Sequence, residues 1–210
     1  MKKLASRILK IVFFTLIIIA VVIILIPFDL FDMKQAQRIA KWKTTYEQLE
    51  YSFALIKEHE GIIIPQENEN SIDITEDIIT SHVAPYLNLE FNKPTKIKYR
   101  YRKMNSHPIT KKSPLYFRNF LKRKDGVFIG IRKNEQKNND INKPPYIMYV
   151  DINGKEKPNR IGKDIFFIGI YKDNIIPMGK KEKNTTLKSD CSPIGTGIYC
   201  SEYYLQGGRF

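Results

Sequence analysis

The sequence predicts an α+β fold in which an N-terminal transmembrane helix continues into a long amphipathic helix that packs on an antiparallel β-sheet. Three observations predict this arrangement. Residues 11–28 form one apolar run, residues 39–56 repeat apolar side chains at helical spacing, and several segments after residue 95 have the composition and alternation of strands.

The apolar run from Ile11 to Phe28 contains no charge and one weakly polar side chain, Thr15. A helix of this length rises roughly 27 Å, which is close to the hydrocarbon thickness of a bilayer. Its Ile, Val, Leu and Phe side chains each favour insertion by about 0.3 to 0.6 kcal/mol. A cleaved signal peptide is the alternative, but the run exceeds a usual apolar region and no small-residue cleavage site follows Pro27. We therefore expect a retained signal anchor.

The charges that flank this run set its expected orientation. Four bases precede it and two acids follow it: Lys2, Lys3, Arg7 and Lys10, then Asp29 and Asp32. By the positive-inside rule, residues 1–10 form a cytoplasmic tail and residues 11–28 cross the cell membrane once. Residues 29–210 then form one extracytoplasmic domain. In such a compartment Cys191 and Cys200 are expected to form a disulfide.

The helix is expected to continue beyond the membrane. Its apolar positions fall three or four residues apart, in one stripe: Ile39, Trp42, Tyr46, Leu49, Phe53 and Ile56. Gly61 stands where a glycine would end the helix. A second helix is expected from about Ile74 to Leu87, with Asp73 as its N-terminal cap. A coiled-coil partner would also use the stripe, but its short length favours packing on the protein's own domain.

The rest of the chain is expected to be mainly β-structure. Residues 96–102 alternate bases with Ile97, Tyr99 and Tyr101, as in a half-buried strand. Further strands are expected over 127–132, 146–152 and 164–171, with turns at 153–154 and 172–174 that favour hairpins. Residues 104–124 are expected to be irregular or weakly helical, and the glycine-rich tail from Cys191 to be rich in turns.

One segment carries a family resemblance. Residues 150–155 read VDINGK and are followed by Pro158-Asn159, Gly162, Asp164 and Phe166. This pattern resembles a segment of bacterial pilin-like proteins. Together with the N-terminal layout, it makes the chain similar to type IV pilins and to pseudopilins of type II secretion systems, roughly over residues 145–210 and, in general layout, over the first 60. The resemblance implies a subunit that acts by assembly, with secretion-system or pilus subunits as partners.

The N-terminus departs from the prepilin pattern. Prepilins carry a glycine before the cleaved bond, then Phe-Thr-Leu-Ile-Glu. Here Phe13 precedes Phe14-Thr15-Leu16-Ile17, and Ile18 stands at the position of the glutamate. Because prepilin peptidase cuts after glycine, we expect residues 1–13 to be retained.

No constellation of catalytic residues stands out, so we expect a non-enzyme without a small-molecule substrate or an obligatory cofactor. Some pseudopilins bind calcium in C-terminal loops, and the resemblance implies four candidate ligands here: Asp151, Asn153, Asn159 and Asp164. The alternative is a hydrogen-bonded Asx turn.

Basic residues concentrate between residues 93 and 124, interleaved with aromatic ones, and acids concentrate between residues 47 and 90. The bases are Lys93, Lys96, Lys98, Arg100, Arg102, Lys103, Lys111, Lys112, Arg118, Lys122, Arg123 and Lys124. Such a segment suits a polyanion such as DNA, anionic lipid or an envelope polymer. A signal-anchored polyanion-binding module is therefore the second functional hypothesis. The alternative is a solvated face neutralised by the acidic segment.

Overall fold

The structure is a computed structural model that describes residues 2–61, 76–90, 95–96, 100–117, 119–134 and 143–209, without the side chains of 2–6, 9, 23–32 and 76–78. The first helix, α1 (Lys2–Glu60), contributes to two compact units, residues 1–38 and residues 39–210. Each unit is described by itself.

In the first unit, α1 carries apolar side chains on every face. All the side chains from Ile11 to Val22 are exposed, and the Thr15 hydroxyl donates to the carbonyl oxygen of Ile11 at 2.7 Å. Over the described residues, no helix holds an apolar stretch long enough to span a membrane. The last third of the predicted span, residues 23–28, has no described side chains. The transmembrane segment therefore stays a prediction.

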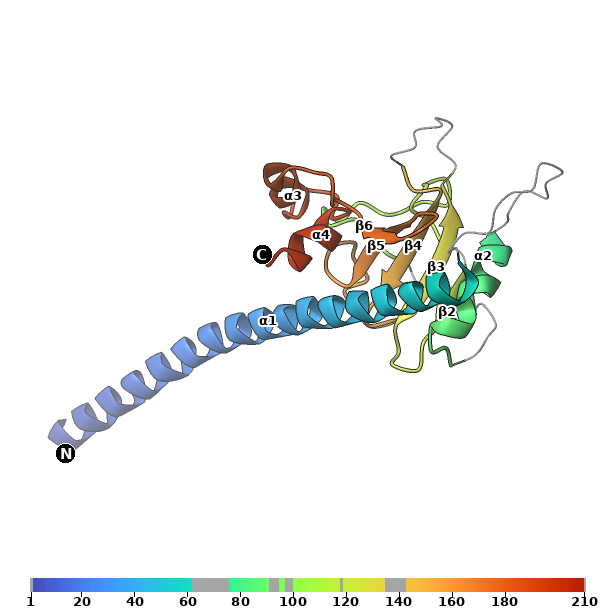
Figure 1. Ribbon diagram of the computed structural model, residues 1–210. Helices are drawn as coiled ribbons and strands as arrows, with labels where there is room; N and C mark the ends of the chain where they lie inside the picture. Colours follow the sequence, from blue (N-terminus) through green and yellow to red (C-terminus); the bar gives the residue numbers. More distant parts are fainter. Residues whose placement is uncertain are drawn as a thin grey trace. The chain divides into compact units, whose positions relative to one another are not determined.

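The second unit is built on a six-stranded sheet in which each strand pairs antiparallel with its sequence neighbours (Figure 1). The strands are β1 (Thr95–Lys96), β2 (Asn119–Lys122), β3 (Phe128–Lys133), β4 (Tyr146–Asp151), β5 (Ile165–Ile170) and β6 (Ile175–Pro177). Strands β3 to β5 lie within a residue or two of the expected ones, and β6 follows the expected turn at 172–174. The α+β class with an antiparallel sheet is confirmed.

Alternation along β4 divides the core into two layers. Met148 and Val150 belong to the layer that contains the α1 stripe, whereas Ile147 and Tyr149 belong to a second, aromatic layer on the other face. All six residues of β4 are buried, as are all six of β5. A strand buried on both faces reads as a continuous apolar run, which is how the sequence of β4 and β5 appears.

The predicted stripe of α1 packs on the first of these layers. From Trp42 to Ile56 its members are buried, and Ile39 packs partly buried against them. The Trp42 ring stacks on Phe166 of β5 with the ring centroids 4.3 Å apart, and its indole nitrogen donates to the Ser201 carbonyl at 2.9 Å. Tertiary burial, rather than intrinsic propensity, is therefore the main support of this half of the helix.

Two short helical elements complete this layer. Gly61 has a φ of +76° and its amide donates to the Lys57 carbonyl, so α1 ends as expected. Helix α2 (Glu76–Val83) ends earlier than predicted and gives way to a 3-10 turn (Ala84–Tyr86) that contains Pro85. The predicted cap at Asp73 lies outside the described residues.

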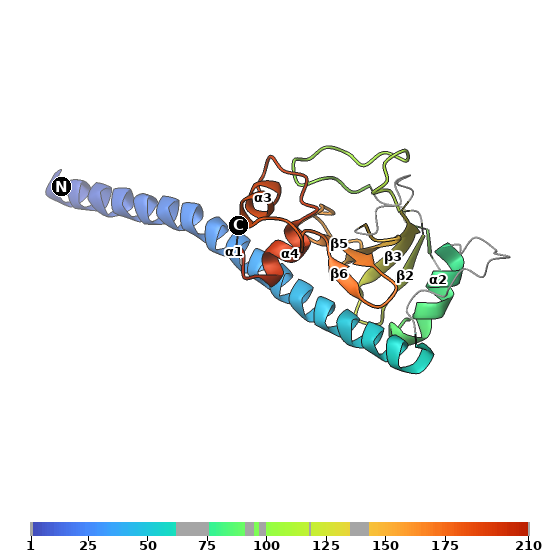
Figure 2. The same ribbon diagram turned by 45° about the horizontal axis from the view of Figure 1, so that its top comes forward.

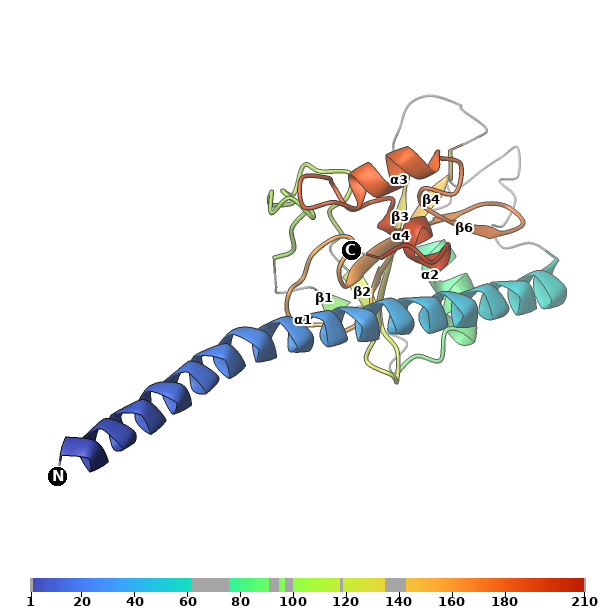
Figure 3. The same ribbon diagram turned by 90° about the vertical axis from the view of Figure 1, so that its left-hand side faces the viewer.

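Three predictions about local structure were wrong or only partly testable. Strand β2 lies inside the segment expected to be irregular. Helix α4 (Cys200–Leu205) lies in the tail expected to be rich in turns, beside helix α3 (Asn184–Asp190), for which no element was predicted (Figure 3). Of the strand predicted over residues 96–102, Lys96 belongs to β1 and Arg102 makes isolated bridges. Residues 97–99, including Tyr99, lie outside the described residues.

The contribution of the stripe can be measured. Leu49 is fully buried, whereas Tyr51, two residues later on α1, is 67% exposed. Leu49→Ala is expected to lower the free energy of unfolding by about 2–5 kcal/mol, because it leaves a cavity under the helix. Tyr51→Ala is the control and should change it by less than about 0.5 kcal/mol. Fluorescence of Trp42, the single tryptophan, reports unfolding of the detergent-extracted chain in urea. Equal effects of the two changes would contradict the packing described.

Candidate functional site

The segment 100–117 carries much of the predicted basic region and lies on the face of the sheet away from α1 (green in Figure 2). Tyr101 anchors it: the ring is 2% exposed and meets Tyr149 edge to face. Its hydroxyl donates to the Leu115 carbonyl at 2.7 Å and accepts the Phe117 amide at 2.8 Å. Burial raises the pKa of the Tyr101 phenol. The predicted inward direction of Tyr101 is confirmed.

Most of the described bases of this region are accessible. Lys96, Arg100, Arg102, Lys111, Lys112 and Lys124 are exposed, and Lys103 and Lys122 are half-buried. Lys98, with Lys93 and Arg118, lies outside the described residues. The described bases therefore come from β1, β2, the turn after β2 and the segment 100–117, rather than from one strand.

Arg123 does not belong to this exposed surface, and its inclusion was wrong. The residue is 5% exposed, and its Nη2 donates to the side-chain oxygen of Gln48 on α1 and to Asp125 at 2.9 Å. Successive side chains of an extended chain point to opposite faces. Arg123, which forms an isolated bridge with Leu89, directs its side chain toward α1. Its role is to tie the turn after β2 to α1.

Neutralisation by the acidic segment is limited in the part of the chain that the structure describes. Lys122 forms an ion pair with Glu90. The exposed bases Lys96, Arg100 and Lys111 form no ion pair with a described acid. Among the described residues, the ion pair of Lys122 is therefore the one contact by which the acidic segment neutralises this surface.

A second basic stretch, which sequence reasoning did not connect to the first, meets it in space. The amide of Arg102 donates to the Asn159 carbonyl at 3.0 Å, and the amide of Ile161 donates to the Arg102 carbonyl at 2.8 Å. This pairing brings Arg160 beside Arg102. Lys155 and Lys157 precede it in the same loop and are exposed. The only available signal was the basic composition of residues 155–160, because the pairing is non-local.

The four predicted calcium ligands lie in this loop and at its ends. The Asp164 carboxylate accepts the amides of Asn159 at 2.7 Å and Arg160 at 2.6 Å. The Asp151 carboxylate accepts the amide of Asn153 at 3.2 Å and the hydroxyl of Tyr149 at 3.4 Å. Both aspartates are fully buried. Their observed part is to hold the loop through Asx-type hydrogen bonds.

The fit to calcium is incomplete. The oxygen types are suitable, and the side-chain oxygens of Asn153 and Asn159 are buried without a hydrogen-bond partner. A cation would nevertheless compete with four donors for the two carboxylates, and no cluster of three or more His, Cys, Asp or Glu occurs among the described residues. Calcium binding stays a prediction.

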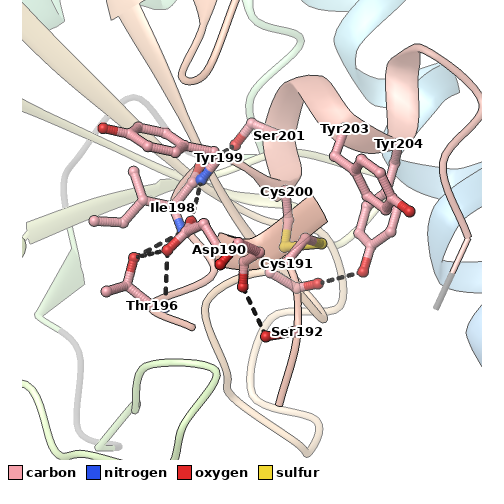
Figure 4. The surroundings of a disulfide bond; sticks show 12 residues. Asp190, Cys191, Ser192, Thr196, Ile198, Tyr199, Cys200, Ser201, Tyr203 and Tyr204 are labelled. Carbon is pink, nitrogen blue, oxygen red and sulfur yellow. Dashed lines mark hydrogen bonds between the residues drawn. A yellow bond between two sulfur atoms is a disulfide. The ribbon is translucent and has the colours of Figure 1, made fainter. Parts of the chain in front are cut away.

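The C-terminal region is closed by a disulfide between Cys191 and Cys200, whose Cα atoms are 5.1 Å apart (Figure 4). Asp190 organises the loop between them. Its carboxylate accepts the amide of Thr196 and the amide of Tyr199, both at 2.8 Å, as well as the Thr196 hydroxyl. The disulfide and this carboxylate together hold α3 against the start of α4.

This region is also tied to the sheet. The Ser201 hydroxyl accepts the amide of Phe167 on β5 at 2.9 Å, and the Tyr204 hydroxyl donates to the Gly162 carbonyl at 3.1 Å. Ser201 also accepts the Trp42 indole through its carbonyl. Helix α4 therefore connects α1, β5 and the loop that carries the family-like segment.

Comparisons with protein-family models, with curated proteins and with solved structures found no match for this chain. The likeness to pilins and pseudopilins therefore rests on the sequence pattern and the layout.

The disulfide is open to a direct test. Replacing both Cys191 and Cys200 with serine is expected to lower the free energy of unfolding by about 2–3 kcal/mol, since the short loop loses its cross-link in the unfolded chain. Alkylation of the wild-type chain under non-reducing denaturing conditions should label neither cysteine. Two labelled thiols, or an unchanged stability in the double variant, would contradict this assignment.

Proposed function

We propose that the chain is a membrane-anchored, pilin-like subunit that acts by assembly in a type II secretion or type IV pilus system and not by catalysis. The observation that carries the proposal is the amphipathic half of α1 lying on an antiparallel sheet, with Trp42 stacked on Phe166. The family-like segment at residues 150–166 and the C-terminal disulfide support the same assignment.

The proposed anchor is the apolar run at residues 11–28. Between Ile11 and Val22 every side chain is exposed in the isolated chain, so this surface needs an apolar surrounding. Its one hydroxyl, on Thr15, is satisfied within the helix by the carbonyl of Ile11. A helix with satisfied backbone and side-chain donors is suited to lipid, where an unpaired polar group costs several kcal/mol.

Co-isolation tests the assembly proposal. The tagged chain is extracted from its native membrane in mild detergent, and the proteins that remain bound are identified by mass spectrometry. Recovery of secretion-platform or pilus subunits is the expected outcome. A Leu49→Ala variant, in which the domain is destabilised, shows whether recovery of these subunits requires the folded domain. A chain recovered only as a monomer, with the wild-type domain folded, would contradict the proposal.

The N-terminus provides a second test. Because Phe13 occupies the position of the glycine that prepilin peptidase requires, residues 1–13 are expected to remain in the mature protein. Intact-mass measurement of the membrane-extracted chain reads this directly. As a matched variant, Phe13→Gly with Ile18→Glu restores the prepilin pattern and should become a substrate for cleavage. A wild-type mass that starts at Phe14, with or without a methyl group, would refute retention.

A second candidate function is a signal-anchored module that binds polyanions. The observation that favours it is the set of exposed bases in the segment 100–117, which form no ion pair with a described acid and are joined by Arg160 through its pairing with Arg102. Binding of this kind releases counterions, so its affinity falls steeply with salt.

If the chain binds polyanions, replacing the outward-pointing bases near residue 101 should affect binding, whereas replacing the inward-pointing Tyr101 should affect stability. Changing Lys98, Arg100 and Arg102 to alanine is expected to flatten the log–log dependence of affinity on salt by about two to three units, with stability unchanged. Changing Tyr101 to alanine should instead cost about 3 kcal/mol or more of stability, because a buried ring and its two hydrogen bonds are lost. Salt titrations and urea unfolding of both variants provide the comparison. If Tyr101→Ala lost binding but kept its stability, the Tyr101 side chain would point outward, and the assignment made here would be wrong.

A further inference from the structure

The second unit contains an open groove of about 480 Å³ beside the ends of β1, β2 and β3. It is lined by side chains from these strands and from the turn after β4, and most of its wall is apolar. Its volume lies in the range of sites that hold a small ligand or one unit of a polymer. No residue assigned above to the membrane anchor or the disulfide region lines it.

Two phenylalanines form the apolar part of the wall. Phe120 is 2% exposed and meets Tyr149 edge to face with the ring centroids 4.8 Å apart. Phe128 is half-buried, so part of its ring remains accessible. Gly154 has a φ of +66°, and a Cβ added there would lie 3.1 Å from the Gly126 carbonyl oxygen, so the turn after β4 favours a glycine at this position. The apolar wall of the groove is therefore formed by one buried ring and one partly accessible ring.

Three lysines from three different elements line the same groove: Lys96 of β1, Lys122 of β2 and Lys155 of the turn. Lys122 is paired with Glu90, and Glu156 also lines the groove. Lys96 and Lys155 form no ion pair with a described acid. The groove therefore combines a partly accessible ring with two cations that have no described acid as partner, which is the combination that suits a flat, anionic ligand.

The positive charge continues beyond the groove. From Lys155 the chain leads through the exposed Lys157 to Arg160, which is bridged to Arg102. One small ligand would not span this series of bases. A polymer with a charge on every unit would, since each phosphate could meet one base while its ring enters the groove.

We propose that the groove binds a single-stranded nucleic acid by stacking a base on Phe128 and holding the neighbouring phosphates with Lys96 and Lys155. The proposal rests on the second candidate function and deepens it. It names a binding site and a chemical group, the nucleic-acid base, that is recognised in addition to the phosphate charge. Assembly into a filament or secretion platform is neither required nor excluded by it.

The test compares two strands of equal charge. The full chain in a non-ionic detergent is titrated with a fluorescent ten-nucleotide oligothymidine and with an abasic strand of the same length. Oligothymidine is expected to bind about fivefold or more tightly than the abasic strand, because stacking adds to the charge term. Phe128→Leu keeps apolar volume but removes the ring, so it should abolish this difference and leave the abasic affinity unchanged. Tyr51→Leu, which removes an exposed ring on α1, is the matched control and should preserve the difference.

The lysines are tested by salt dependence. Lys96→Ala combined with Lys155→Ala is expected to weaken both strands and to flatten the log–log slope by about 1.4 units, since each lost contact on a single strand contributes about 0.7. Lys188→Ala on α3 removes one exposed lysine outside the groove and should leave the slope within error.

Three outcomes overturn the proposal. Equal affinity for the two strands would leave a polyanion surface without base stacking, so the second candidate function would stand and the groove assignment would fail. Binding to vesicles of anionic lipid without binding to either strand would assign the charge to a membrane surface. Absence of binding to both strands and to vesicles would remove the polyanion function itself.

Discussion

The burial of one stripe of α1 on the sheet is the interaction on which the rest of the domain depends. Trp42 connects three parts of the chain by stacking on Phe166 of β5 and donating to Ser201 at the start of α4. Farther along the helix, Gln48 accepts a hydrogen bond from the buried Arg123, which joins the turn after β2 to the same helix. Without this face, β3 to β5 would expose a continuous apolar layer to water. The helix thus both completes the core and links it covalently to the apolar N-terminal segment.

The other face of the sheet explains where the charged surface lies. Tyr101 and Phe117 hold the segment 100–117 over an aromatic layer, while Arg100 and Arg102 remain exposed. Backbone pairing with residues 159–161 then adds a second basic stretch. The same loop contains the family-like pattern, and the carboxylates of its two aspartates accept hydrogen bonds that hold the loop in shape. The packing of Tyr101 and Phe117 and the backbone pairing with residues 159–161 therefore bring bases from separate segments onto one surface.

Sequence reasoning succeeded where a periodic pattern was long enough to be read locally. The stripe from Ile39 to Ile56 and the apolar runs of β3 to β5 are examples, since helical and strand periods distinguish them. Strand β2 was missed because four residues within a basic segment give little local signal, and pairing with β1 and β3 is non-local. The helices α3 and α4 are short, and their ends are held by the disulfide and by the hydrogen bonds of Asp190, which leave no helical period in the sequence. Arg123 was misplaced because it lies between two other bases, Lys122 and Lys124, although strict alternation along the chain would have placed its side chain on the opposite face.

The central proposal is that one helical sequence serves two surroundings: residues 42–56 pack on the sheet, and residues 11–28 are proposed to lie in lipid. Hydrogen exchange of the full chain, read by mass spectrometry in lipid nanodiscs, tests it most directly. The account predicts slow exchange in both stretches, with faster exchange over residues 42–56 alone when Leu49 is changed to alanine. Fast exchange of residues 11–28 in lipid, or of residues 42–56 while β4 and β5 remain protected, would contradict it.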